Sequence, residues 1–210
     1  MITKTPVKNV PGFKKITSSE YKKAEIFRQI IAFFEVDRPE KHCYSVYGDD
    51  LALMWKKFRK NYQLVTAGGG LVRNNKNKIL FIYRNDKWDL PKGKAEPNEL
   101  ITETALREVK EECEIKNLIP IRHLVDTYHT YGSRMNRKLK KTSWFRMYTE
   151  DRDLQPQLAE GITRIKWVKE EKLGKILKNT YPNILEVIRA EINSQPKHER
   201  KEWHAMVNFE

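Results

Sequence analysis

The sequence predicts an α+β fold whose core is a mixed, largely non-parallel sheet. Apolar, β-branched runs dominate residues 63–168, and turn-forming clusters such as "NNKNK" separate consecutive runs. Helical patterns are inserted before and after the runs instead of alternating with single strands, which argues against repeated βαβ units. An apolar content of 39% and an aromatic share of 10% favour a packed core over a wholly disordered chain.

The N-terminal stretch is predicted to form two helices and a short strand, without recognisable chemistry. "SSEYKKAEIFRQIIAFF" predicts a helix that starts at Ser18 or Ser19 and ends before Arg38-Pro39. "YSVY" is typical of a short strand, and "DDLALMWKKFRK" predicts a helix capped by Asp49 or Asp50. The apolar stripe of the first helix consists of Ile26, Phe27, Ile30, Ile31 and Phe34.

The next segment, "QLVTAGGGLVR", predicts a strand that pairs with "KILFIYR". Its three glycines lack the G-x-G-x-x-G spacing and precede a strand, which argues against a dinucleotide fingerprint. They indicate a bulge or a close backbone approach instead. In the following "KWDLPKGK", Pro91 and Gly93 should force a turn.

The rest of the chain predicts a helix, three strands and a closing helix. Pro97 to Cys113 should form one helix, with Glu99 in the first turn, where acids favour the helix dipole. Ile101, Ala105 and Val109 supply an apolar edge that docks this helix on the sheet. The later elements are the strands "IPIRHLVDTYHTY", "KLKKTSWFRMY" and "GITRIKWV" and the amphipathic helix "PNILEVIRAEI".

The chain is strongly basic, with 41 Lys and Arg against 28 Asp and Glu and a net charge of +13. Such a field gathers polyanions, which include nucleic acid, nucleotides and other phosphate-rich molecules. No apolar run approaches the roughly 20 residues that a membrane span needs, and the amino terminus lacks a secretory signal. Cys43 and Cys113 lack zinc-site spacing, so we expect two reduced thiols in a cytoplasmic protein.

Three carboxylates crowd one face of the predicted central helix. Glu108, Glu111 and Glu112 span an arc of about 100°, and like charges that close destabilise a helix unless something positive lies among them. Oxygen ligands suit a hard divalent cation, either Mg²⁺ or Mn²⁺. A solvated acidic helix face is the alternative. Arg107 is spaced to hold Glu103 or Glu111 from the side.

This helix and the turn before it resemble the signature of Nudix hydrolases, G-x5-E-x7-R-E-U-x-E-E-x-G-U, where U is a bulky aliphatic residue. Eight of its nine defined positions are present, and Glu114 replaces the last glycine. That position calls for a left-handed residue, which a non-glycine adopts at a cost of roughly 1 kcal/mol. The matching residues are Gly93, Glu99, Arg107, Glu108, Val109, Glu111, Glu112 and Ile115.

The resemblance implies a Nudix-like α/β/α sandwich and a metal site. The metal ligands would be Glu108, Glu111, Glu112 and the backbone carbonyl of Lys92. Glu99 would be a structural partner of Arg107, and Gly93 would support the turn. We expect an N-terminal extension over residues 1–61, a Nudix domain over 62–193 and a basic tail over 194–210.

The resemblance also implies catalytic and substrate-binding residues. The general base would be Glu111 or Glu112, or Glu160 in a later loop, which is otherwise an ordinary loop acid. Arg84 and Lys92 are candidates for substrate contact, and Trp88 either stacks on a base or covers the core. The basic hairpin adds two further substrate candidates, Tyr131 and Lys140, although a solvated hairpin tip is the alternative there.

Together these features predict a metal-dependent hydrolase of a pyrophosphate bond in a nucleoside diphosphate linked to another moiety. Dinucleoside polyphosphates, nucleoside triphosphates and similar polyanions all fit the charge. The alternative is a Nudix-fold module that binds a nucleotide or nucleic acid without turnover. Whether nucleic acid is a partner, and whether the chain forms a homodimer, the sequence leaves open.

Overall fold

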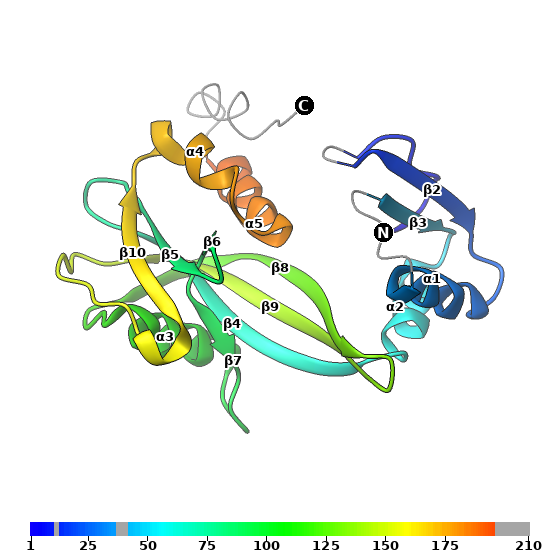
Figure 1. The fold of residues 1–210 in the computed structure, drawn as a ribbon, viewed down its shortest axis with the longest axis horizontal. Helices are drawn as coiled ribbons and strands as arrows, with labels where there is room; N and C mark the ends of the chain where they lie inside the picture. The colour runs from blue at the N-terminus through cyan, green and yellow to red at the C-terminus, as the bar shows by residue number, and fades with distance from the viewer. Residues whose placement is uncertain (11–12, 37–41, 196–210) are drawn as a thin grey trace. The chain divides into compact units, whose positions relative to one another are not determined.

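The computed structural model describes residues 1–10, 13–36 and 42–195, which form two compact units (Figure 1). The predicted helix break at Arg38-Pro39 and nearly all of the predicted tail lie outside these residues. Among the helices described, none has the length and apolar character needed to cross a membrane. In the described chain, unit 1 comprises residues 1–64 and 130–139, and unit 2 comprises 65–129 and 140–195.

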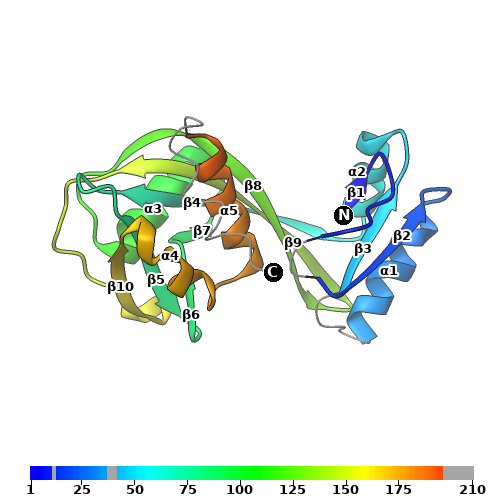
Figure 2. The same ribbon diagram turned by 90° about the horizontal axis from the view of Figure 1, so that it is seen from above.

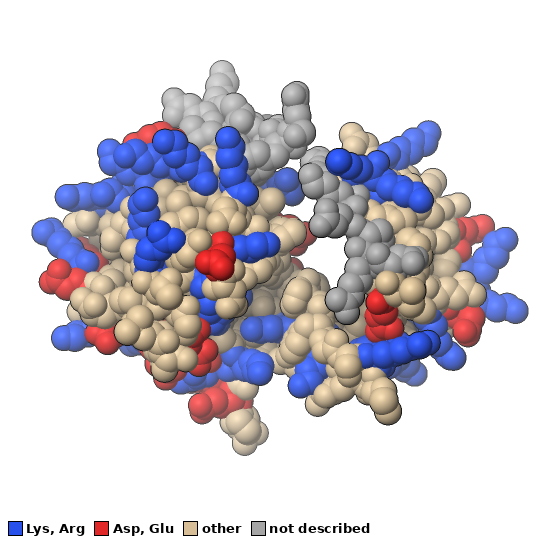
Figure 3. Space-filling view, viewed as in Figure 1, with Lys and Arg blue, Asp and Glu red and all other residues tan. Residues whose placement is uncertain are grey.

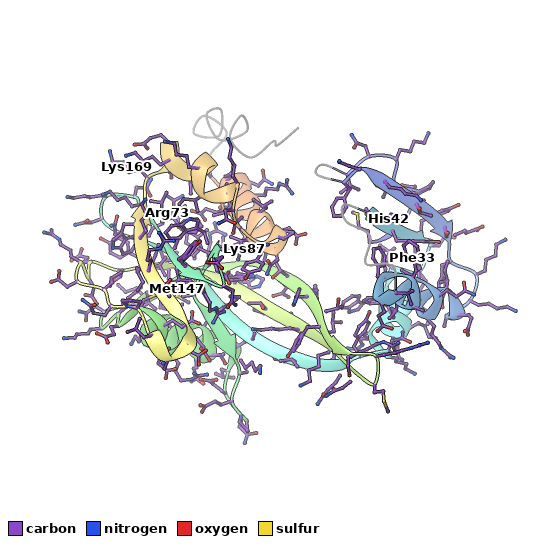
Figure 4. The ribbon with its side chains drawn as sticks, viewed as in Figure 1. Phe33, His42, Arg73, Lys87, Met147 and Lys169 are labelled. Atoms are coloured by element: carbon purple, nitrogen blue, oxygen red, sulfur yellow. The ribbon has the colours of Figure 1, made fainter. Side chains whose placement is uncertain are left out.

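Unit 1 is a small parallel sheet with two helices. The strand order is β1-β3-β2, and both neighbours of β3 run parallel to it. Phe27, Val46 and Met54 form its buried core, and Phe33 stacks edge-on to His42 at 5.3 Å between ring centroids (Figure 4). The elements are β1 Ile2–Thr3, β2 Lys15–Glu20, α1 Glu25–Val36, β3 His42–Tyr47 and α2 Leu51–Arg59.

The predicted start of the first helix at Ser18 or Ser19 is wrong. Both serines lie in β2, and the helix begins at Glu25. The Ser18 Oγ hydroxyl bonds to the backbone of Val7, and β2 pairs along its length with a strand more than twenty residues away. A local apolar pattern does not report such pairing. The second helix is capped by Asp50, whose Oδ1 accepts from the Leu53 N–H at 2.8 Å.

Residues 130–139, the tip of the basic hairpin, pack with the N-terminal segment in unit 1. Arg137 holds Glu35 of α1 through two hydrogen bonds, Nε to Oε1 at 2.5 Å and Nη2 to Oε2 at 2.8 Å. These bonds lower the pKa of Glu35. A paired fork of this kind fixes geometry as well as charge. Arg137 is therefore engaged within the protein instead of lying in a solvated tip.

Unit 2 is built on the second sheet, whose strand order is β10-β5-β4-β9-β8, with β6 beside β5 and β7 beside β4. Helix α3 covers one side of this sheet, and α4 and α5 cover the other (Figures 1 and 2). The expected α+β sandwich with a mixed sheet is confirmed. The strands are β4 Gln63–Arg73, β5 Ile79–Arg84, β6 Lys87–Asp89, β7 Lys92–Lys94, β8 Ile119–Ser133, β9 Asn136–Tyr148 and β10 Ile162–Val168.

The helices of unit 2 are held by apolar packing on both sides of the sheet, and a buried ion-pair cluster adds to it at α5. The core under α3 includes Val109 and Met147 (Figure 4). On the other side, the buried Arg73 guanidinium donates to Glu191 of α5 at 2.9 Å and to Glu170 at 2.5 Å. The helical elements are α3 Ile101–Cys113, η1 Leu158–Glu160, η2 Glu170–Lys172, α4 Leu173–Leu177 and α5 Pro182–Asn193.

Helix α3 begins later than predicted, at Ile101 instead of Pro97. Asn98 has a left-handed φ of 64°, which ends any helical path through this segment. The Glu99 carboxylate accepts from the Glu96 N–H at 2.9 Å, so residues 96–99 form a turn that precedes the helix. Glu99 therefore acts from outside the helix.

The C-terminal end of α3 has the left-handed residue that the sequence predicts. Glu114 adopts φ 51° and ψ 38°, and its N–H bonds to the Lys110 carbonyl. The Ile115 N–H bonds to the same carbonyl at 3.2 Å. The closing geometry of the helix is therefore kept although the residue is not glycine.

We expect Glu114→Gly to raise the free energy of unfolding by about 1 kcal/mol, because glycine adopts this conformation without the Cβ penalty. Urea denaturation measures the change. Glu114→Asn should give part of the gain and Glu114→Ala none, since asparagine tolerates the left-handed region and alanine does not. Equal stability of the glycine and alanine variants would contradict the strain argument.

Candidate active site

Glycines of β4 let α3 lie unusually close to the sheet. A Cβ at Gly68 would meet the Ala105 backbone nitrogen at 2.6 Å, and a Cβ at Gly70 would meet Val109 Cγ2 at 2.9 Å. The close backbone approach that the glycine run predicted is therefore present. It brings the polar face of α3 beside β5, β6 and β7.

Arg107 is the hub of the acidic side of α3. Its Nε and Nη2 donate to the two Glu99 oxygens at 2.8 and 3.0 Å, and Nη2 also donates to the Lys94 carbonyl at 3.1 Å. Its Nη1 donates to Glu108 at 2.9 Å and Glu111 at 3.2 Å. The bonds from Arg107 lower the pKa of Glu99 to about 2. Glu103, the other partner that the sequence suggested, instead accepts from the Leu100 N–H.

Gly93 makes room for the Glu108 carboxylate. A Cβ on Gly93 would lie only 1.8 Å from Glu108 Oε2, a separation that no two such atoms adopt. Burial is the main cause that raises the pKa of Glu108, against the opposing effect of Arg107. A larger residue at this position would therefore oblige the Glu108 carboxylate to move from its place over Gly93.

Glu112 is the most buried of the three clustered acids, with a side chain 2% exposed. Its Oε2 accepts from the Lys92 N–H at 2.9 Å, and its Oε1 lies 3.3 Å from Arg84 Nη1. Burial raises the pKa of Glu112 to about 7, although Lys92 and Arg84 act in the opposite direction. The carboxylate is thus held in a partly desolvated site between cationic and backbone donors.

Glu111 and Glu160 are the open acids of the site. The Glu111 side chain is 49% exposed, and that of Glu160 is 58% exposed. Glu160 Oε2 lies 3.9 Å from Arg84 Nη1, so η1 returns to the strand that faces α3. Charge on Glu160 also contributes to the raised pKa of Glu108. The structure therefore brings Glu160 into the neighbourhood of the helix acids.

The charges that balance these carboxylates in the structure are arginines. Arg107 contacts Glu108 and Glu111, and Arg84 contacts Glu112. In the described chain, no three Asp, Glu, His or Cys side chains are close enough together to form a ready-made metal cluster. The donor chemistry nevertheless fits Mg²⁺ or Mn²⁺, because Glu108, Glu111 and Glu112 of α3 all offer hard carboxylate oxygens.

Cationic side chains gather on the opposite side of these acids. Lys92 Nζ lies 2.5 Å from Asp89 Oδ2, and Arg84 Nη2 lies 3.9 Å from the same oxygen. Burial, together with the nearby charges of Lys92, Arg84 and Lys94, lowers the pKa of Lys140 to about 8. An anion that binds among these crowded, partly buried cations would reduce their mutual repulsion.

Two of the residues selected from the sequence make their contacts with other groups, Trp88 within unit 2 and Tyr131 within unit 1. Trp88 packs edge-on against Tyr83, with ring centroids 5.0 Å apart. Tyr131 folds with unit 1, where Lys138 Nζ lies 5.9 Å from the centre of its ring. The other selected residues all belong to unit 2.

Sequence reasoning missed Asp89 and Lys94. Asp89 is 3% exposed and pairs with Lys92, so it sets the position of that side chain. The only local signal was an acid within an otherwise apolar strand end, "KWDLP". Lys94 acts through its backbone carbonyl, which side-chain patterns cannot report.

A comparison with models of protein families places the same region in one family. A model of the NUDIX domain matches residues 64–190. Similar solved structures include a MutT protein from Methanosarcina mazei Go1, at 22% identity and a TM-score of 0.49 over 64% of this chain and 98% of that one. An Ap4A hydrolase from C. elegans matches at 24% identity and a TM-score of 0.45 over 60% of this chain and 93% of that one.

We expect Gly93→Ala to destabilise the protein by about 1 kcal/mol, the low end of overpacking costs, because the new methyl group displaces only the end of the flexible Glu108 side chain. A double-mutant cycle with Glu108→Ala, followed by urea denaturation, isolates this contact. In the Glu108→Ala background the same glycine substitution should cost little. An equal cost in both backgrounds would assign the effect to the backbone instead.

We expect Glu112→Gln to stabilise the metal-free protein at pH 8 by roughly 1–3 kcal/mol. The folded pKa of about 7 exceeds the ordinary value of 4.5, so the folded state holds a proton that the unfolded state has lost between these pH values. The stability that Glu112 confers is therefore present at low pH and is lost as pH rises through about 7. Glutamine, which stays neutral, escapes that loss.

The measurement is urea denaturation in chelator at pH 5 and pH 8. The difference between Glu112→Gln and wild type should shrink toward pH 5. Glu171→Gln, at a side chain 60% exposed, is the matched control and should show no such trend. A difference that does not vary with pH would contradict the burial argument.

Proposed function

The chain belongs to the NUDIX family of pyrophosphohydrolases, and from this premise we propose that it cleaves a pyrophosphate bond in a nucleoside diphosphate linked to another moiety. The family match covers the segment that contains the acids of α3 and the cations facing them. The observation that carries the proposal is the buried Glu112, held between the Lys92 N–H and Arg84. Acids that can bind a metal stand beside cations that can bind phosphate.

Glu108, Glu111 and Glu112 would hold Mg²⁺ or Mn²⁺, with the Lys92 carbonyl as a further ligand. When bound, such an ion neutralises phosphate oxygens and lowers the pKa of a coordinated water. Arg107 positions Glu108 and Glu111 from one side, whereas the Lys92 N–H positions Glu112 from the other. The non-reacting phosphates would be bound by Arg84, Lys92 and Lys140, which would orient the phosphate chain of the substrate.

A general base must accept the proton of the attacking water. Glu112 is buried and already holds two donors, whereas Glu111 and Glu160 are open to solvent. We propose Glu160 or Glu111 for this role, and we propose metal ligation for Glu112.

The basic balance of the chain fits dinucleoside polyphosphates and nucleoside triphosphates. We infer a cytoplasmic location from the free thiols of Cys43 and Cys113.

A magnesium-dependent hydrolysis screen tests the proposal. The substrates are diadenosine polyphosphates, nucleoside triphosphates, nucleotide sugars and inositol pyrophosphates, and the measured quantity is phosphate or nucleotide release. Glu112→Gln should lower turnover by about 10²-fold or more. Glu171→Gln should keep wild-type turnover. Tight nucleotide binding without any product would favour the binding module over the enzyme.

A second pair of variants separates the two candidate bases. The true base should lose about 10²- to 10⁴-fold in kcat on substitution by glutamine, and its loss should flatten the acidic limb of the pH–rate profile. We expect this for one of Glu160→Gln and Glu111→Gln. A modest fall in both, with the acidic limb retained, would move the role to Glu112 or Glu108.

A further inference from the structure

A second recognition surface lies at the outer edge of unit 2, on side chains that the metal and phosphate chemistry does not use. A cavity of about 390 Å³ opens along β10, and its size falls within the ordinary range of ligand pockets, about 300–1,000 Å³. Lys and Arg side chains gather along β10 and α4 on the face seen in Figure 3. The cavity is lined by Trp88, Leu154, Pro156, Thr163, Arg164, Ile165 and Lys166.

Two flat groups line this cavity, Arg164 and Trp88, and the Tyr83 ring lies beside both. Arg164 on β10 stands opposite Tyr83 on β5, which stands opposite Trp88 on β6. The Arg164 guanidinium lies 3.9 Å from the centre of the Tyr83 ring and 5.5 Å from that of Trp88. Arg164 is exposed, so the side of its plane away from Tyr83 is open. Planar guanidinium and indole groups are the ones on which nucleobases stack.

The cavity also offers hydrogen-bonding groups. It touches four consecutive residues of β10, from Thr163 to Lys166, so it follows the edge of the strand and not one face of it. In the part of the chain that the structure describes, β10 is the terminal strand of its sheet. Its outward N–H and C=O groups therefore have no strand partner and can pair with the polar edge of a base.

The cavity borders the acid site through two covalent connections. Pro156 on its wall is followed by Gln157, whose N–H bonds to the Glu112 carbonyl at 3.2 Å. Thr163 lies three residues after Glu160, and its hydroxyl bonds to the Tyr83 carbonyl, next to Arg84. The cavity and Arg84 are therefore neighbours along strand β5, in which Tyr83 and Arg84 are consecutive residues. Lys166, 6.0 Å from the centre of the Trp88 ring, adds positive charge at the other end.

We propose that this cavity binds the nucleobase of a nucleotide substrate, stacked on Arg164 and Trp88 and paired with the free edge of β10. The inference rests on the proposed function for its orientation and names the substrate class as nucleotides. Inositol pyrophosphates, which carry no planar base, are thereby disfavoured. The contacts of Arg164 with Tyr83 and Trp88 also stabilise the edge of the sheet. The test must therefore separate stacking on a ligand from packing within the protein.

The test is calorimetric titration of the whole chain with AMP, GMP, CMP, UMP and ribose 5-phosphate, which has the sugar phosphate but no base. At least one nucleotide should bind about 5- to 150-fold more tightly than ribose 5-phosphate, the span that stacking of one base supplies. Equal affinity for all five compounds would overturn the proposal.

Arg164→Lys is the decisive variant, because it keeps the charge and removes the plane. We expect it to lose about 5-fold or more of the nucleotide affinity while ribose 5-phosphate binding stays unchanged. Arg28→Lys on α1, at a side chain 70% exposed, is the matched control and should alter neither. Trp88→Leu gives a second readout. A loss of base preference at unchanged thermal stability would assign Trp88 to ligand stacking and not to packing. Wild-type base preference in both cavity variants would overturn the proposal.

These experiments distinguish a failure of the proposed base-binding site from a failure of the proposed hydrolysis. Base-dependent binding that Arg164→Lys weakens, in a protein that cleaves none of the substrates, would support the cavity and defeat the proposed hydrolysis. Cleavage of nucleoside triphosphates with a KM that Arg164→Lys leaves unchanged would support the proposed hydrolysis and defeat the proposed base-binding site.

Discussion

The fan of hydrogen bonds from Arg107 is the interaction on which the geometry of unit 2 depends most. One guanidinium joins the turn before α3 through Glu99, strand β7 through the Lys94 carbonyl, and the helix face through Glu108. An arginine is needed there because only its planar fork presents five donors in fixed directions. A lysine would supply the charge without fixing three segments at once.

The same guanidinium solves the electrostatic problem of the helix face. Glu108 and Glu111 share it, and Arg84 serves Glu112, so each acid has a positive neighbour even before any divalent cation arrives. Metal binding would therefore replace the arginine partners of these carboxylates with a divalent cation. It would not simply relieve repulsion between unpaired carboxylates. The burial of Glu112 adds a cost to the metal-free state, which a bound cation would remove. Affinity for the metal is thus linked to pH through a group whose pKa is about 7.

What could be predicted from the sequence was local. The acids and Arg107 share one helix, so their spacing alone placed them on one face, and the left-handed residue at Glu114 followed from the pattern. What could not be predicted depends on pairing between distant residues. Strand β2 exists because β3 lies beside it, and Arg137 meets Glu35 across a separation of 102 residues. Asp89 was missed because an isolated acid gains its role only from the Lys92 and Arg84 side chains around it.

Strand β5 connects the two ends of the proposed substrate by the simplest rule of strand geometry. Adjacent side chains point to opposite faces of a sheet, so Arg84 meets Glu112 of α3 while its neighbour Tyr83 carries Arg164 and Trp88. A shift of one residue in the pairing of β5 with β10 would turn Arg164 to the other face and remove it from Tyr83. The antiparallel register of that pair places Ile162 opposite Arg84 and Arg164 opposite Tyr83, with a shift in register between Ile162 and Arg164. The proposed sites for phosphate and for a base therefore draw on two consecutive residues of one strand, Arg84 and Tyr83.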